Sequence, residues 1–260
     1  MFGITVLQPR YRELVLFKAF TGLRAEASRT YLSFLWWILE PILSMSVYYV
    51  VFGLLFQRGT EDFVAFLLVG LVVWQWFANS IKHGMNAIHS NGRLMTQVDL
   101  PKEIFPTIEM VMDLVKFGFV FALLLIFLWI YGFDISPAYL ALPLVIGVEL
   151  LLLTTFTYLA AAIIPFVPDL KFLIDALLQL AFFLSGIFYA GASIPEQYQT
   201  YFYLNPMANL IEAYRDILMD GVWPDWAALF KVGLFALAGV YSAQLLIQRF
   251  NHLYPRIVEA

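Results

Sequence analysis

The chain has 260 residues, of which 62% are hydrophobic and 13% are charged, and its formal net charge is −4. A soluble domain has about 45–50% apolar and about 25% charged residues, so this composition excludes an ordinary soluble protein and indicates a membrane protein. The lack of cysteine excludes disulfides, thiolate nucleophiles and cysteine-ligated metal sites, and the weak charge without a basic block argues against nucleic-acid binding.

The first predicted element is a helix over residues 9–30. Leu16, Phe20, Leu23 and Ala27 would share one face of it, among basic residues. Amphipathic helices of this kind lie on membrane surfaces, and basic ones favour the cytoplasmic leaflet. We therefore predict an N-terminal amphipathic interface helix.

Hydrophobic runs long enough to cross a bilayer make up most of the remaining chain. A spanning helix needs about 20 mostly apolar residues to cross about 30 Å of hydrocarbon. No internal repeat or linker divides the sequence, so we predict a single transmembrane domain over residues 1–260. The six predicted spans cover about 32–56, 63–81, 108–131, 138–164, 172–190 and 226–247.

The distribution of Lys and Arg predicts the orientation. Eleven of these residues fall in the segments on one side of the predicted spans, and two, Arg58 and Arg215, fall on the other. Cytoplasmic loops carry the excess of positive charge. The sequence therefore predicts an all-α membrane protein with six transmembrane helices and with both the N and C termini in the cytoplasm.

The largest predicted cytoplasmic connection is 82–107, and it ends in the string 99–106. Pro101 and Pro106 bound this string and predict that any helix between them is short. The histidines, which all fall in predicted cytoplasmic segments, are interpreted as solvated side chains at the membrane interface; they are His83, His89 and His252.

The segment 191–224, between the fifth and sixth predicted spans, is apolar but has many polar interruptions. Asn205 and Pro206 are a favourable helix start, with Asn as the N-cap and Pro at the first helical position. Glu212 and Arg215 lie off the apolar stripe of this helix at a spacing that allows pairing. We predict short re-entrant or periplasmic helices at the outer boundary. The predicted stripe is Leu204, Met207, Ile211, Tyr214 and Leu218.

Charged residues inside spans are costly, so each is a functional candidate. Glu109, Asp113 and Lys116 would share one face of the third span. Asp113 and Lys116 form either a structural pair buried between helices or part of a gating element. Glu149, alone in the fourth span, is interpreted as hydrogen-bonded to a Thr or Tyr neighbour.

Asp175 and Gln179 form a polar seam on the fifth predicted span, four residues apart. A seam of this kind faces either a cavity or a partner helix. No phosphate-binding loop, His-Glu-x-x-His pair or Gly-x-Ser-x-Gly elbow occurs in the sequence. We therefore expect no enzyme activity, no catalytic residue and no metal site in this chain.

Five segments, in order along the chain, resemble the ABC-2-type permeases that export bacterial polysaccharides. Leu32-Ser-Phe-Leu-Trp-Trp-Ile-Leu-Glu-Pro41 is similar to the family's Leu-Gly-x-Leu-Trp-x-x-Leu-x-Pro entrance to the first span. The loop with Asn91-Gly-Arg-Leu-Met and Leu100-Pro-Lys-Glu-Ile-Phe-Pro106 is similar to its Asn-x-x-Leu-Ile and Phe-Pro-Arg/Lys-Glu-Ile-Leu-Pro. The resemblance extends over about residues 10–250. The remaining similar segments are Ser185–Tyr189, Ile194–Tyr198, and Leu204–Met207 followed by Glu212 and Arg215.

The resemblance implies a permease subunit of an ATP-driven exporter in the bacterial inner membrane. Such a subunit pairs with itself as a homodimer and with two copies of a separate ATPase. ATP and Mg would bind that ATPase, and this chain would bind no cofactor. The exported substrate would be a lipid-linked polysaccharide made in the cytoplasm.

The resemblance also assigns roles to segments of this chain. The family's channel is walled largely by the first and fifth spans, which suggests Phe34, Trp37, Asp175 and Gln179 as the substrate path. The short helices after the fifth span would form the outer gate, with Asn205, Pro206, Glu212 and Arg215. The ATPase-coupling loop would include Arg93, Leu94, Leu100, Pro101, Lys102 and Glu103.

The sequence is compatible with several functions. The 101–106 string resembles the O-antigen branch more than the capsule branch, so O-antigen is the first substrate expected, and capsular polysaccharide or teichoic acid the second. A drug or lipid exporter of the same superfamily is another alternative. A secondary transporter would show an inverted repeat, and a membrane enzyme would show clustered acids or histidines at one leaflet; neither pattern is present.

Overall fold

The computed structural model describes residues 9–29, scattered positions between 39 and 51, and residues 62–98 and 100–258. Every element within these residues is a helix, and none is a strand. The first predicted span is therefore described only at scattered positions. Phe34 and Trp37 lie outside the described residues.

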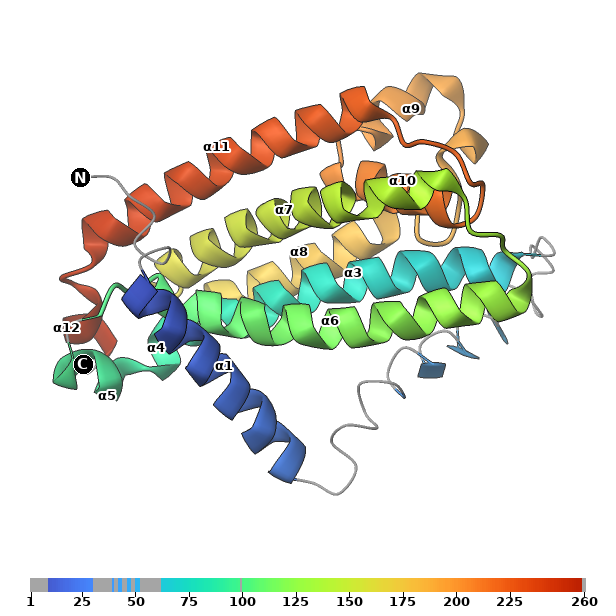
Figure 1. The fold of residues 1–260 in the computed structure, drawn as a ribbon. Coiled ribbons are helices and arrows are strands. Elements are labelled where there is room, and N and C mark those ends of the chain that lie inside the picture. Colours follow the sequence, from blue (N-terminus) through green and yellow to red (C-terminus); the bar gives the residue numbers. More distant parts are fainter. Residues whose placement is uncertain are drawn as a thin grey trace.

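Six long helices carry the fold, and short ones connect them (Figure 1). The long helices are α1 (Pro9–Arg29), α3 (Phe63–Met85), α6 (Ile104–Tyr131), α7 (Leu142–Ile163), α8 (Leu170–Leu184) and α11 (Trp226–Phe250). The short ones are α4 (Ala87–Ser90), α5 (Gly92–Gln97), η3 (Pro137–Ala141), η4 (Gly191–Ser193), α9 (Glu196–Phe202), α10 (Pro206–Leu218) and α12 (Tyr254–Val258).

Four of the described helices are long and apolar enough to cross a membrane: Phe63–Met85, Ile104–Tyr131, Pro137–Ile163 and Trp226–Phe250. They overlap the second, third, fourth and sixth predicted spans. The prediction of an integral, all-helical membrane protein is thus confirmed.

The fifth predicted span, 172–190, has the wrong extent. Helix α8 has 15 residues and ends at Leu184, which corresponds to about 22 Å against about 30 Å of hydrocarbon. Gly186 follows with φ of 72°, a left-handed conformation that glycine adopts without the clash a Cβ atom causes. The chain therefore turns out of the helix at this point.

The prediction that Pro101 and Pro106 enclose only a short helix is also wrong. Helix α6 begins at Ile104 and runs for 28 residues, with Pro106 in its first turn. The amide groups of the first turn have no partner inside the helix, so proline costs no hydrogen bond there. Pro106 thus belongs to the long helix.

Helix α3 is the centre of the bundle. Of the 18 most apolar consecutive residues, 78% are buried inside the protein in α3 but only 22% in α11. Figure 1 shows α6 and α7 beside α3, with α11 along the outer side of α7. The packing of α3 includes a stacked ring pair, Trp76 on Phe117 of α6, with centroids 4.0 Å apart.

Helix α1 crosses α6 at one end of the bundle (Figure 1). Among the α1 side chains that the structure describes, Val15 and Ala19 are buried, whereas Leu16 and Phe20, which the sequence placed on the apolar face, are 54% and 66% exposed. The helix therefore presents one apolar face to the protein and leaves a second one uncovered. An uncovered apolar face is compatible with the predicted position at a membrane surface.

Helices α7 and α11 approach each other closely at Gly239. A Cβ atom there would overlap the Cγ2 methyl of Thr155 and lie 2.8 Å from its Oγ1. The same hydroxyl donates to Ala236 O across the interface at 2.9 Å. Gly239 therefore sets the spacing of the two helices.

We expect Gly239→Ala to destabilise the protein by about 1–3 kcal/mol, because the new methyl group overpacks this contact. Gly233→Ala is the matched control on the same helix, since its nearest neighbour would be Val148 Cγ2 at 3.8 Å. Both substitutions gain about 1 kcal/mol of helix propensity. Thermal unfolding of both variants in detergent measures the difference, and equal midpoints would contradict the close packing.

Candidate functional site

The outer-gate segment is built around α10, and its start is as the sequence predicted. Asn205 caps the helix, with its side-chain oxygen accepting from the Met207 amide at 3.0 Å, and Pro206 follows at the first helical position. Four residues of the predicted stripe are buried: Met207, Ile211, Tyr214 and Leu218. Leu204, the fifth, is 74% exposed because it precedes the helix.

Arg215, which the resemblance assigned to the outer gate and whose spacing allowed a pair with Glu212, lies inside the protein. Its side chain donates to Phe66 O, Gly186 O and Ile187 O, at 2.7–3.3 Å. The guanidinium also stacks on the Phe66 ring, 3.3 Å from the centroid. Arg215 thereby holds α10 against the first turns of α3 and the irregular segment after α8.

This contact explains how the irregular backbone after α8 is tolerated. Carbonyl groups outside a helix need another donor where water is scarce, and Arg215 supplies it to residues 186 and 187. Burial lowers the Arg215 pKa to about 9, while Glu212 and Asp220 act in the opposite direction. The guanidinium therefore stays protonated at neutral pH and remains a donor.

Glu149 of α7 is hydrogen-bonded to a tyrosine, in line with the interpretation made from the sequence. The Tyr214 hydroxyl of α10 donates to Glu149 Oε2 at 2.7 Å, and both side chains are fully buried. Within the described part of the chain, Oε1 of Glu149 has no hydrogen-bond partner. Tyr214 is thus the group that satisfies this buried carboxyl.

We expect Tyr214→Phe to destabilise the protein by about 1–3 kcal/mol, because the Glu149 carboxyl loses its donor while still buried. Glu149→Met together with Tyr214→Phe should recover most of the loss, since both polar groups are then removed. Unfolding midpoints in detergent test this cycle. Tyr241→Phe, at a 59% exposed site on α11, is the control, and a double variant as weak as the single one would contradict the pairing.

A charge cluster joins α1, α3 and α6. His83 Nδ1 lies 2.9 Å from the Asp113 carboxylate, and Lys116 Nζ lies 2.7 Å from Glu26 of α1 but 3.8 Å from Asp113. The Asp113–Lys116 pair predicted from the sequence is therefore the longest of these contacts. His83 is 47% exposed, in line with its interpretation as a solvated side chain, and it also contacts the buried Asp113 carboxylate.

Asp175 and Gln179 are exposed on α8 and line a groove against α3. The groove has a volume of about 480 Å³, and its walls include Trp74, Lys82 and Phe182. A polar, partly aromatic groove suits the predicted substrate path. Its role stays a prediction.

The predicted coupling residues separate into two groups. Arg93 is exposed, while Leu94, Leu100 and Pro101 are half-buried. Lys102 and Glu103 are 3% and 1% exposed, and Lys102 Nζ donates to the Leu100 carbonyl at 2.9 Å. These two charged residues therefore belong to the interior of this chain, and a surface role for their side chains is not supported.

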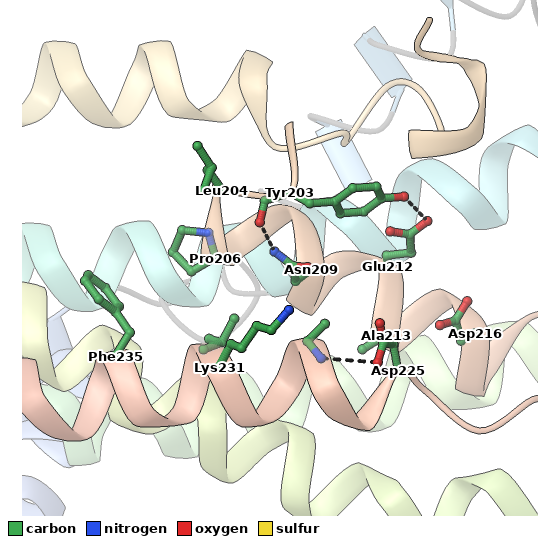
Figure 2. A pocket seen from close by; sticks show the side chains of 12 residues that line it. Tyr203, Leu204, Pro206, Asn209, Glu212, Ala213, Asp216, Asp225, Lys231 and Phe235 are labelled. Atoms are coloured by element: carbon green, nitrogen blue, oxygen red, sulfur yellow. Dashed lines mark hydrogen bonds between the residues drawn. The ribbon is translucent and has the colours of Figure 1, made fainter. Parts of the chain in front are cut away.

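A cavity between α10 and α11 was not predicted from the sequence (Figure 2). It has a volume of about 750 Å³. Glu212 lines it, and its carboxylate accepts from the Tyr203 hydroxyl at 3.0 Å. Lys231, an ionisable residue inside the sixth predicted span, was the signal that could have indicated it. The other polar side chains of the wall are Asn209, Asp216 and Asp225.

The described residues contain no group of three or more His, Asp or Glu side chains that could hold a metal ion. The polar sites found are instead an inward clamp at Arg215, a charge cluster near α1, a groove on α8 and the α10–α11 cavity. All four lie between helices of different parts of the chain. They are suited to binding and to helix movement.

Comparison with known proteins gives concordant results. The O-antigen export system permease protein RfbA of Myxococcus xanthus is 29% identical over 92% of this chain and 93% of its own length. The protein of the same name from Klebsiella pneumoniae is 26% identical over 91% and 90%. The polysialic acid transport protein KpsM of Escherichia coli is 26% identical over 84% and 86%.

The family model described as ABC-2 type transporter matches residues 23–219. This match includes the Arg215 clamp, the charge cluster, the α8 groove and the α10 wall of the cavity, and it extends over well more than half of the chain. The chain therefore belongs to the ABC-2 type transporter family.

Proposed function

We propose that this chain is the permease subunit of an ATP-driven exporter that moves a lipid-linked polysaccharide out of the cytoplasm, with O-antigen as the first candidate. The observation that carries the proposal is the similarity to O-antigen export permeases over at least nine-tenths of both chains. A similarity of that extent leaves little room for a different domain arrangement. The 101–106 string also favours O-antigen, because it resembles the O-antigen branch more than the capsule branch.

The topology we propose has six spans and cytoplasmic termini, in the inner membrane. Four long apolar helices support it directly, and the excess of Lys and Arg in one set of connections supports the orientation. In this topology α8 enters the membrane as a short fifth span, and α9 and α10 return the chain toward the outer surface. Arg215 supports this arrangement, because it supplies donors to the carbonyls where α8 has ended.

The assembly we propose is a homodimer with two copies of a separate ATPase. The chain has no phosphate-binding loop, so ATP and Mg would be held by the ATPase and no cofactor by this subunit. The end of the bundle with α4, α5 and α12 would contact the ATPase (Figure 1). The opposite end, with α9 and α10, would be the outer gate.

The substrate path we propose runs along the α8 groove with Asp175 and Gln179, together with Phe34 and Trp37 at its cytoplasmic entrance. Aromatic rings and polar side chains together suit sugar rings, whose C–H faces are apolar and whose hydroxyl groups need hydrogen bonds. Asn205, Pro206 and Glu212 would lie at the exit. Arg215 would contribute by holding α10 in place.

Deletion of the gene in its own bacterium tests this function. Lipid-linked glycan should accumulate inside the cell, the surface polymer should disappear, and the wild-type gene should restore both. Normal surface polymer in the deletion strain, with no internal accumulation, would contradict the proposal.

A capsular polysaccharide is the second candidate substrate, because KpsM is also similar over most of this chain. The same deletion strain separates the two. Loss of the polysaccharide ladder of lipopolysaccharide on a gel supports O-antigen, whereas loss of a capsule with an intact ladder supports the second candidate.

A further inference from the structure

The α10–α11 cavity changes in chemical character along its length. Asp225, the N-cap of α11, lies at one end, and Phe235 lies at the other. Ten residues of helix separate them, which is about 15 Å along the axis. The wall is carboxylate-rich near Asp225 and becomes apolar toward Leu204, Val232 and Phe235. The cavity is therefore polar at one end and apolar at the other, as one membrane leaflet is between its head groups and its hydrocarbon.

Lys231 is the basic residue of this wall. It lies within the membrane-spanning helix α11, about 8 Å from its start at Trp226. The part of the chain that the structure describes offers it no ion pair or hydrogen bond. Figure 2 shows its ammonium group pointing into the cavity toward Asn209. A cation at this depth is costly unless an anionic group meets it.

Acidic side chains surround the polar end. Glu212 uses Oε1 to accept from Tyr203, and Asp225 uses Oδ1 to cap α11. Asp216 lies next to them. Burial and the neighbouring carboxylates raise its pKa to about 6, so it is mostly ionised at neutral pH. The cavity thus has three carboxylates and one ammonium.

This arrangement selects among ligand classes. A diphosphate or other multiply charged anion would meet Lys231 but be repelled by the surplus of carboxylates. A free saccharide would fit the polar end but would leave the apolar end, with Leu204 74% and Phe235 54% exposed, without a partner. An amphiphile with both an ammonium and a phosphate in its head group satisfies every part of the wall.

We propose that this cavity binds a zwitterionic aminophospholipid, with its phosphate on Lys231, its ammonium between Glu212 and Asp216, and its acyl chains against Leu204 and Phe235. The volume of about 750 Å³ is within the range of about 300–1,000 Å³ typical of ligand sites. The site depends on α11 being a membrane helix. It does not depend on which polymer is exported.

Native mass spectrometry of the purified full chain in detergent tests the proposal. The probes are phosphatidylethanolamine, its N-acetyl derivative, which lacks the ammonium charge, and phosphatidylglycerol. We expect phosphatidylethanolamine to bind about tenfold more tightly than the other two, because charge-assisted hydrogen bonds are worth about that factor or more.

Two substitutions should have different, charge-specific effects. Lys231→Gln removes the phosphate contact and should weaken all three lipids by about tenfold. Glu212→Gln with Asp216→Asn should abolish the preference for phosphatidylethanolamine over its N-acetyl derivative. Lys231→Arg keeps the charge and should retain binding. Lys171→Gln on α8 and Glu196→Gln on α9, both outside the cavity wall, are the matched controls.

Three results would overturn the proposal. One is a lipid affinity that Lys231→Gln leaves unchanged, or that Lys231→Arg lowers as much as Lys231→Gln does. Another is a persistent ammonium preference in the Glu212→Gln and Asp216→Asn double variant. The last is displacement of phosphatidylethanolamine by a soluble oligosaccharide, which would make the cavity a sugar site. None of them depends on export, so the proposed function stands or falls separately.

Discussion

Replacing Arg215 with methionine is expected to destabilise the protein by about 3–5 kcal/mol, because removing one side of a buried polar network leaves the other side unsatisfied. The carbonyls of Gly186 and Ile187, which lie outside any helix, would lose their donor, and that of Phe66 would lose its contact with the guanidinium. Methionine fills part of the volume, so the loss comes mainly from the missing hydrogen bonds and from the missing stacking on Phe66. Tryptophan fluorescence during thermal unfolding in detergent measures the change.

Two variants control this experiment. Arg249→Met removes an exposed arginine near the end of α11 and should shift the midpoint little. Arg215→Lys keeps one charge but loses the forked geometry that reaches several carbonyls, so it should be intermediate. A midpoint for Arg215→Met within the error of Arg249→Met would show that the clamp contributes little.

The same contact changes the expectation for the gate. A gate has to move, so its helices are expected to pack less completely than the spans. For α10 this is wrong: nine of its 13 residues are buried. Gly70 of α3 permits the approach, since a Cβ there would lie 2.8 Å from Arg215 Nη2. A movement of α10 must either break the clamp or carry α3 and the end of α8 with it.

Reversing charge and polarity on α5 is expected to abolish export by preventing ATPase binding. Arg93 is exposed on this helix, and Val98, just after it, is 46% exposed. Arg93→Glu with Val98→Asp should weaken binding of the ATPase by tenfold or more, about what a lost charged contact and a desolvated apolar contact provide. Pull-down of the ATPase with the purified permease, and surface polymer in cells, measure the effect.

The choice of residues follows from the packing. Leu94, another residue of the predicted coupling loop, is half-buried against the core, so Leu94→Asp would also disturb the fold. Helix α12 packs closely against α5, since a Cβ atom on Gly92 of α5 would contact the side chain of Val258 of α12. Val222→Asp is the matched control, since Val222 is 50% exposed in the connection between α10 and α11. Unchanged ATPase binding in the α5 double variant would remove α5 from the coupling site.

The sequence by itself determined the class of protein and the positions of most helices. Hydrophobic runs longer than a bilayer requires are sufficient to predict spanning helices, because the runs reflect the solvent and not a particular partner. The start of α10 at Asn205-Pro206 was predictable for a similar reason. N-caps and N1 prolines act through the local backbone alone.

Only the tertiary structure decided where the polar side chains find their partners. Arg215 bonds a carbonyl 149 positions away in the chain, and Lys116 pairs with Glu26, 90 positions away. Helical periodicity places a side chain on a face but does not say which helix covers that face. From the sequence, Glu212 was only a possible partner of Arg215, and Asp113 was found for Lys116, at 3.8 Å, but the closer Glu26 was not. The buried carbonyls after α8, which α10 satisfies, exist only once the helices are packed.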